Sequence, residues 1–345
     1  MAKTVLVTGA TGFLATYVVK AFLDGGYNVR GTVRSAQKAE HLRQLFPDEQ
    51  KFQIVEVKDL VTGDGLDDAF KGIDVVAHVA SPYTLTVNDP YKDLLEPAIQ
   101  GTLSVLRAAH NHGIKRVVLT SSFAAVTNLL AGGPWRDYTY TDKDFNPTTM
   151  EEAVEPGKPG PFVYSASKVL AEKAAHEFAL EHNLELVAIN PPMIYGPPLQ
   201  RIGAKAEVNT SANAIYSLIL PDVHKGQVPW NRLPLFCSVR DTALAHLRAA
   251  QADAADVAGK RFLICGGAFT WEDAIQHLQN VRPELASRLP ELPADPTQYK
   301  DHGKSIAKID CTPAREKLGF DKFETWQDTL EETIDALVKI EQNWQ

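Results

Sequence analysis

Short apolar runs rich in β-branched residues alternate with helix-like segments, and this alternation most limits what the chain can fold into. The runs are TVLVT, YNVRGTV, FQIVEV, VVAHVA, RVVLTSS and LELVAINPP. Helical patterns separate them at 12–24, 36–46, 64–71 and 94–112, and in the segment that carries YSASK. Such alternation predicts βαβ units, and uniformly apolar strands are covered by helices on both faces. We therefore predict an α/β fold built on a Rossmann-type, doubly wound parallel sheet.

A chain of 345 residues is long enough for one large domain or for two that share a core. We predict an NADP-binding Rossmann domain at 1–192, which the chain rejoins at about 234–266. The remaining parts, 193–233 and 267–345, are expected to form a smaller, discontinuous C-terminal substrate-binding domain. A segment rich in Gly, Pro and Asp at 128–162 is long enough to form a lid or an irregular wall.

The stretch VTGATGFLA follows the first run and opens the first helix-like segment. Gly9 permits a tight turn, Gly12 lets the backbone approach a phosphate, and the small Ala15 lets helix and strand pack closely. The free N–H groups at the start of the helix can then bind a pyrophosphate. Because strand, turn and helix occur in the required order, we favour dinucleotide binding over a plain glycine turn. The expected cofactor contacts in this loop are Gly9, Thr11, Gly12, Phe13 and Leu14.

The end of the second run indicates which dinucleotide is bound. NAD sites usually present an Asp or Glu there to the ribose 2′-hydroxyl, whereas the 2′-phosphate of NADP requires positive charge. The sequence reads RGTVRSAQK, which puts Arg34 at the strand end and Lys38 in the first turn of the next helix. We therefore predict NADP(H), bound by Arg34 and Lys38, although both could be solvated surface charges. Glu40 lies one turn further and is not expected to compete.

Two further strand ends fit the same cofactor. Asp59 and Leu60 follow FQIVEV and suit the amino group and the ring face of an adenine. HVASP ends the fourth run with small residues, where the backbone of a dinucleotide can pass. This adds Val79, Ala80 and Ser81 to the expected contacts, because ligands of doubly wound sheets bind at the carboxyl ends of the strands.

The stretch YSASK places Tyr164 four residues before Lys168. Residues four apart share a helix face whatever their purpose, so an amphipathic turn is the simplest interpretation. The glycine loop favours a second interpretation, in which Tyr164 transfers a proton. A tyrosine has an ordinary pKa of ~10, and a cation on the same helix face lowers that value. We therefore predict that Lys168 lowers the pKa of Tyr164, and that both residues also contact the cofactor.

Ser122 lies at the carboxyl end of the RVVLTSS run. Its hydroxyl could donate to a substrate oxygen as negative charge develops there. A serine after a strand is otherwise commonly a helix cap or a turn residue. With the glycine loop and the Tyr/Lys pair, we favour Ser122, Tyr164 and Lys168 as one catalytic unit.

Five motifs together resemble those of the extended short-chain dehydrogenase/reductase superfamily: TGATGFLA, HVASP, TSS, YSASK and NPPMIYGP. Within it the chain is most similar to the dihydroflavonol-reductase-like branch, which includes fungal NADPH-dependent carbonyl reductases, and the similarity runs through nearly the whole chain. It implies a catalytic group of Ser122, Tyr164 and Lys168, and a nicotinamide carboxamide beside Pro191 and Ile194. This branch permits Ala15 in place of the third glycine, whereas Ser238 stands where many relatives carry an acidic residue.

These observations predict an NADPH-dependent carbonyl reductase that converts an aldehyde or ketone into an alcohol, with Tyr164 as the proton donor. Tyr83, Phe123 and Met193 are expected to border the substrate, although each could equally belong to the core. These side chains are apolar enough for an aliphatic or aryl ketone, a keto ester or a ketoaldehyde. The expected partner is therefore a small-molecule carbonyl substrate.

Two other functions compete with this prediction. Related enzymes with the same catalytic group epimerise or dehydrate nucleotide sugars with a bound cofactor, but they usually employ NAD, which Arg34 disfavours. A non-catalytic NADP-sensing regulator would be expected to lack the acid and its lysine, and this chain has both Tyr164 and Lys168.

Charge and composition exclude several classes of function. A formal net charge of -8 without clustered Lys and Arg argues against nucleic-acid binding. The apolar run near the start is too short for an export signal or a membrane span, so we expect a cytoplasmic protein, monomeric or homodimeric. Cys237, Cys265 and Cys311 are widely spaced and without paired histidines, which favours buried thiols and no metal site.

Overall fold

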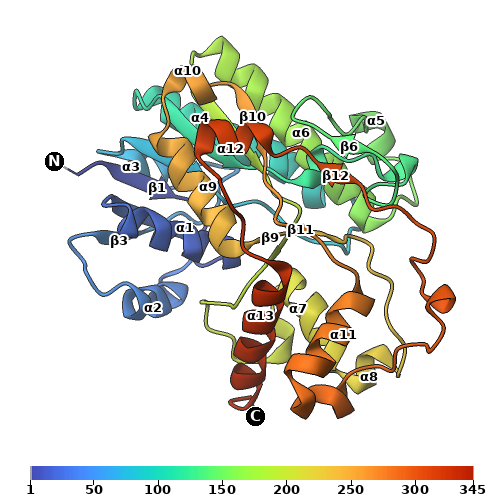
Figure 1. The fold of residues 1–345 in the computed structure, drawn as a ribbon. Helices are drawn as coiled ribbons and strands as arrows, with labels where there is room; N and C mark the ends of the chain where they lie inside the picture. Colours follow the sequence, from blue (N-terminus) through green and yellow to red (C-terminus); the bar gives the residue numbers. More distant parts are fainter. Residues whose placement is uncertain (1, 345) are drawn as a thin grey trace.

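The computed structural model describes residues 2–344, with the backbone but not the side chains of residues 36–38. A seven-stranded parallel sheet lies at its centre, in the order β10-β7-β5-β4-β1-β2-β3 (Figure 1). The strands are β1 (Thr4–Val7), β2 (Asn28–Val33), β3 (Phe52–Glu56), β4 (Val75–His78), β5 (Arg116–Thr120), β7 (Glu185–Asn190) and β10 (Lys260–Leu263). The order reverses between β1 and β4, which is where doubly wound sheets bind ligands. The predicted fold class is confirmed.

Helices cover both faces of this sheet. The helices on one face are α1 (Phe13–Asp24), α2 (Ala36–Leu45), α9 (Val239–Gln251) and α12 (Thr312–Leu318), and those on the other are α3 (Leu66–Phe70), α4 (Glu96–Asn111) and α6 (Gly160–Glu181). Side chains of a strand alternate between faces, so Val5 and Val7 of β1 join the first layer and Leu6 joins the second. All three are fully buried, which explains why the strands read as apolar throughout.

A second core lies beside the sheet, built by the C-terminal part of the chain (Figure 1). Its helices are α7 (Thr210–Tyr216), α11 (Trp271–Val281) and α13 (Trp326–Glu341). The short α8 (Pro221–His224) follows Leu220 of this core, and the short α10 (Ala254–Val257) precedes β10. A three-stranded sheet of β11 (Gly267–Ala268), β9 (Leu235–Ser238) and β8 (Met193–Tyr195) adjoins this core. Within residues 2–344, no helix combines the length and the apolar character needed to cross a membrane.

The segment 128–162 has more regular structure than its composition suggests. It contains α5 (Met150–Ala153), which Thr149 and Glu152 cap reciprocally, and its last residues already belong to α6. It also contains β6 (Thr139–Tyr140), which pairs in parallel with β12 (Lys308–Ile309). This two-residue pairing joins the segment to a part of the chain nearly 170 residues later.

Candidate active site

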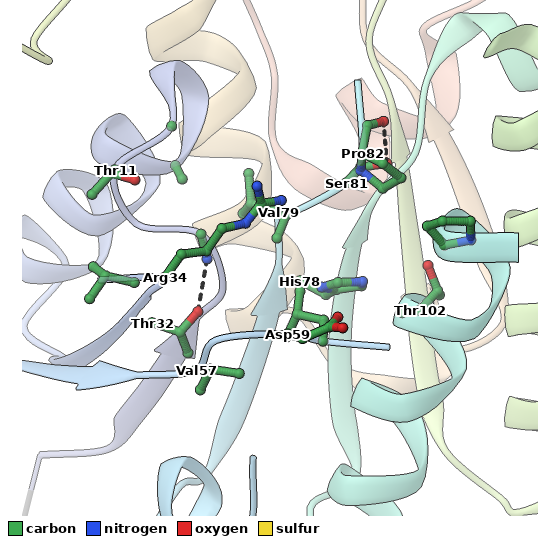
Figure 2. A pocket seen from close by; sticks show the side chains of 18 of the residues that line it. Thr11, Thr32, Arg34, Val57, Asp59, His78, Val79, Ser81, Pro82 and Thr102 are labelled. Carbon is green, nitrogen blue, oxygen red and sulfur yellow. Dashed lines mark hydrogen bonds between the residues drawn. The ribbon is translucent and has the colours of Figure 1, made fainter. Parts of the chain in front are cut away.

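A cleft of about 630 Å³ opens at the carboxyl ends of β1, β2, β3 and β4 (Figure 2). The predicted cofactor residues in its wall are Gly9, Thr11, Gly12, Phe13, Leu14, Arg34, Asp59, Leu60, Val79, Ala80 and Ser81. The wall also includes residues that the sequence did not single out as contacts, chiefly Thr32, Val57, Lys58, Val61, His78, Pro82 and Thr102. The structure thus brings the glycine loop and three other strand ends to one cavity.

The glycine loop has the conformation that its sequence predicts. Gly9 has φ +67°, which favours glycine, and a Cβ on it would lie 2.9 Å from the Cβ of Ala80. The Gly9 N–H donates to Thr32 Oγ1 over 3.0 Å, a bond drawn in Figure 2. Thr8 Oγ1 accepts from the N–H groups of Val79 and Ala80, each over 3.0 Å. These bonds hold the ends of β1, β2 and β4 together below the start of α1. The free N–H groups at the start of a helix can bind a pyrophosphate.

Positive charge marks the end of the cleft formed by β2 and β3. Arg34 is exposed at the end of β2 and lines the cleft, as Figure 2 shows. Lys58 lines it from the end of β3. The nearby carboxylate of Glu40 lies 3.7 Å from Arg43, an ion pair on the surface of α2. The residues therefore fit a ribose 2′-phosphate at this end of the cleft.

Lys38 and Asp59 are the other predicted polar contacts in this region. The side chain of Lys38 lies outside the described residues, although its backbone belongs to α2. Asp59 is exposed in the wall, where its Oδ1 accepts the N–H of Val61 over 2.8 Å. Lys58 was missed, although its place directly after FQIVEV parallels that of Arg34 after the second run. The same strand-end rule could therefore have found it.

The three predicted catalytic residues come together at the end of β5 and on α6. Ser122 Oγ accepts the N–H of Ala124 over 3.1 Å, so it does cap a short helical turn. Its hydroxyl also lies near enough to Tyr164 to lower the pKa of that phenol. Lys168 Nζ lies 5.7 Å from the centre of the Tyr164 ring and donates to Ser81 Oγ over 2.7 Å. Ser81 links this group to the cleft, because it also lines the cavity.

The electrostatics of the pair differ from the prediction. Burial raises the pKa of Tyr164 above its ordinary value, as does Tyr83, and the nearby Ser122 hydroxyl opposes this only in part. Burial lowers the pKa of Lys168 to about 8, against an opposing effect of Glu172. The predicted lowering of this pKa by Lys168 does not appear in this structure, where burial has the largest effect on the phenol. A tyrosine in this environment keeps its proton at neutral pH and can act as an acid.

The three expected pocket residues lie in different environments. Tyr83 is 50% exposed, and its ring packs edge-on against Tyr164 with the ring centres 5.1 Å apart. Phe123 is only 3% exposed and packs in the core against Tyr140. Met193 is partly buried against the C-terminal core. Of the three, Tyr83 is the one with a ring contact to Tyr164.

The residues expected beside the nicotinamide lie outside the wall of the cleft. The carbonyl oxygen of Pro191 accepts the N–H of Phe123 over 2.8 Å, which places the end of β7 next to Ser122. Ile194 is partly buried against the core of the main sheet. Within residues 2–344, no group of three or more His, Cys, Asp or Glu side chains is arranged to hold a metal ion.

Comparisons with known proteins agree with this geometry. The model of the NAD dependent epimerase/dehydratase family matches residues 5–265. An uncharacterized oxidoreductase of Schizosaccharomyces pombe is 39% identical, covering 86% of this chain and 89% of that protein. An NADPH-dependent methylglyoxal reductase of Saccharomyces cerevisiae is 32% identical, covering 98% and 99% respectively. The crystal structure of yeast methylglyoxal/isovaleraldehyde reductase with NADPH superposes with a TM-score of 0.83, at 32% identity and 99% coverage of both chains.

Proposed function

Because this chain belongs to the NAD dependent epimerase/dehydratase family, in its extended short-chain dehydrogenase/reductase branch, we propose that it is an NADPH-dependent carbonyl reductase. It reduces an aldehyde or a ketone to an alcohol. The observation that carries this proposal is the grouping of Ser122, Tyr164 and Lys168, in which Lys168 Nζ lies 5.7 Å from the Tyr164 ring centre and donates to Ser81 in the wall of a dinucleotide cleft. The NADPH dependence of relatives that match over nearly their whole length supports the choice of cofactor.

Each residue of the group has one task in this reaction. Bound NADPH supplies a hydride to the carbonyl carbon. Ser122 donates a hydrogen bond to the carbonyl oxygen as that oxygen becomes negative. Tyr164 transfers its phenolic proton to the same oxygen, which completes the alcohol. The ammonium group of Lys168 stabilises the phenolate that Tyr164 leaves behind.

We propose that the two predicted domains divide these tasks. Residues 1–192 and about 234–266 hold the cofactor, while 193–233 and 267–345 bound the substrate. The return of the chain to the main sheet at β10 and the separate C-terminal core support this division. The exposed aromatic ring of Tyr83 beside Tyr164 supports an apolar carbonyl substrate, such as an aliphatic or aryl ketone, a keto ester or a ketoaldehyde.

We further propose that the protein acts in the cytoplasm, as a monomer or a homodimer. Cys237, Cys265 and Cys311 are free thiols, which supports a reducing compartment. Burial raises the pKa of Cys265 to about 12 and that of Cys311 to about 11, so neither is activated as a nucleophile.

The test is the oxidation of NADPH and NADH by purified protein over a panel of aldehydes, diketones, keto esters and aryl ketones. The Tyr164→Phe variant should lose about 100-fold or more of the rate, because it removes the general acid. Its affinity for NADPH should stay within a few-fold of the wild type. Tyr91→Phe, at an exposed tyrosine, is the control and should keep full activity. Near wild-type turnover by Tyr164→Phe would overturn the mechanism.

A further inference from the structure

Helix α6 continues its polar stripe beyond the catalytic pair. Tyr164, Lys168, Glu172 and His176 follow one another at intervals of four residues and therefore share one face of the helix. Glu172 is fully buried, which is rare for a carboxylate unless it is paired. The sequence signal for Glu172 was the spacing itself, since it repeats that of YSASK by one more turn.

Three elements of the main sheet supply the partners of Glu172. Its carboxylate accepts hydrogen bonds from Ser121 Oγ at the end of β5 and from Arg261 Nε on β10. It also accepts from Asn190 Nδ2 at the end of β7, over 2.8 Å. The same Asn190 group donates to the carbonyl oxygen of Ser122 over 3.2 Å. The Glu172 carboxylate thus holds Ser121 directly and holds the backbone of Ser122 through Asn190.

Arg261 extends this network to the segment after β6. Its Nη1 donates to the carbonyl oxygens of Asp142 and Asp144, over 2.9 and 2.6 Å. Its guanidinium group lies 3.6 Å from the centre of the Phe145 ring. The buried ion pair therefore also fixes the segment that follows β6.

Charges from several elements face Lys168. Glu172 lies one turn away on the same helix, and its negative charge favours the ammonium form of Lys168. His78 faces Lys168 from β4, but burial lowers the pKa of His78 to about 3, so it stays neutral. Tyr164 keeps its proton, since its pKa is raised. Around Glu172 itself lie Arg261 and His176, whose Nε2 is 3.8 Å from the carboxylate.

We propose that Glu172, paired with Arg261, is a positioning residue for the reduction. Glu172 holds the Ser122 backbone beside Tyr164 and keeps Lys168 in its charged form. This inference rests on the proposed function and adds a residue to it. Glu172 touches neither the cleft wall nor the catalytic hydroxyls directly, and acts through Ser121, Asn190 and Lys168.

The test is the pH profile of kcat/KM for Glu172→Gln. Removing the negative charge lowers the pKa of Lys168, so Lys168 loses its proton at a lower pH. The alkaline fall in activity should therefore shift to lower pH by about half a unit or more. A shift of one unit would reduce the rate about tenfold above that pKa and leave it nearly unchanged well below. An unchanged alkaline limb would overturn the proposal.

Two further variants separate charge from folding. The Glu172→Gln variant leaves the Arg261 cation buried without a partner carboxylate, and an unpaired buried charge destabilises the fold. The double variant Glu172→Gln with Arg261→Met removes both charges together. The double variant should shift the alkaline limb in the same direction but by less, because removing the Arg261 cation itself favours the charged form of Lys168. Glu185→Gln is the matched control, because Glu185 also pairs with an arginine, Arg116, but at the opposite end of β7. It should leave the pH profile unchanged.

An NMR titration of lysine side chains distinguishes failure of this inference from failure of the proposed function. The Lys168 signal, assigned with Lys168→Met, should titrate at a lower pH in Glu172→Gln than in the wild type, whether or not any carbonyl is reduced. If the wild type reduces no carbonyl but the Lys168 titration is shifted in Glu172→Gln, the reductase is rejected and the electrostatic role of Glu172 is kept. Unaltered titration in an active enzyme would reject that role alone.

Discussion

At the scale of single residues, the cleft distinguishes its cofactor by charge. Arg34 and Lys58 stand at the ends of neighbouring strands, and both line the cleft. The wall also contains Asp59, whose carboxylate already accepts the Val61 N–H. A 2′-phosphate at this end would meet two cations on adjacent strands, whereas a 2′-hydroxyl would leave both without a partner.

Arg34→Ala should therefore weaken NADPH selectively. Loss of one charge-assisted contact is expected to raise the Kd for NADPH about tenfold or more, with the Kd for NADH almost unchanged. Fluorescence titration with each cofactor measures this. Arg43→Ala removes an arginine of α2 that pairs with Glu40, so it serves as the control. Equal losses for both cofactors in Arg34→Ala would show that Arg34 does not bind the 2′-phosphate.

At the scale of elements, the segment after β4 packs tightly over the start of α6. A Cβ on Gly160 would lie 1.9 Å from the carbonyl oxygen of Leu85. Only a residue without a side chain lets the segment pass there. This close approach brings Tyr83 onto the ring of Tyr164. The first turn of α6 and the contact between Tyr83 and Tyr164 thus depend on one glycine.

Gly160→Ala should displace this segment and with it Tyr83. We expect a lower melting temperature, because overpacking costs about 1–3 kcal/mol, and a raised KM for the carbonyl substrate. The Kd for NADPH should change little. Gly203→Ala is the control, since a Cβ there would meet only Glu207, a flexible side chain 3.4 Å away. If Gly160→Ala matched Gly203→Ala in both stability and KM, the close packing would have no functional role.

At the scale of the whole molecule, two buried histidines couple folding to pH. His246 links α9 to β5, with Thr242 O 2.8 Å from Nδ1 and Thr120 Oγ1 2.6 Å from Nε2. Burial lowers its pKa to about 4. His78 lies on β4 at the centre of the sheet, 2.9 Å from Thr8 Oγ1. Both histidines stay neutral in the folded chain. In the unfolded chain both bind a proton once the pH falls below the ordinary pKa of histidine.

Stability should therefore fall as the pH decreases from 7 to 5. The unfolded state takes up the protons, so each histidine lowers the free energy of unfolding by about 2 kcal/mol at pH 5. Urea unfolding at both pH values measures this loss. His246→Gln removes one titrating group and should make the dependence shallower, while the exposed His110→Gln should not. A wild-type free energy that is flat over this range would contradict the prediction.

The main sheet could be predicted from the sequence because its signals are local. Each strand is a short apolar run, and a parallel crossover leaves few alternatives for the order. The cleft could also be predicted, because ligands of such sheets bind at the carboxyl ends of the strands, and this locates Gly9, Arg34 and Asp59 without long-range information. The pairing of β6 with β12 carries no such signal, because two residues on each side have no periodicity. Nor does the sequence show that Arg261, from the edge strand, meets Glu172.

The position of the cleft residues along the chain has a consequence for synthesis. All residues that line the cleft lie between Gly9 and Thr102. They leave the ribosome before Tyr164, and long before β12, which pairs with β6. A growing chain thus has every residue of its cofactor cleft before it can do chemistry. A C-terminal truncation after Thr102 and before Lys308 keeps all the residues that line the cleft and loses β12, the strand that pairs with β6.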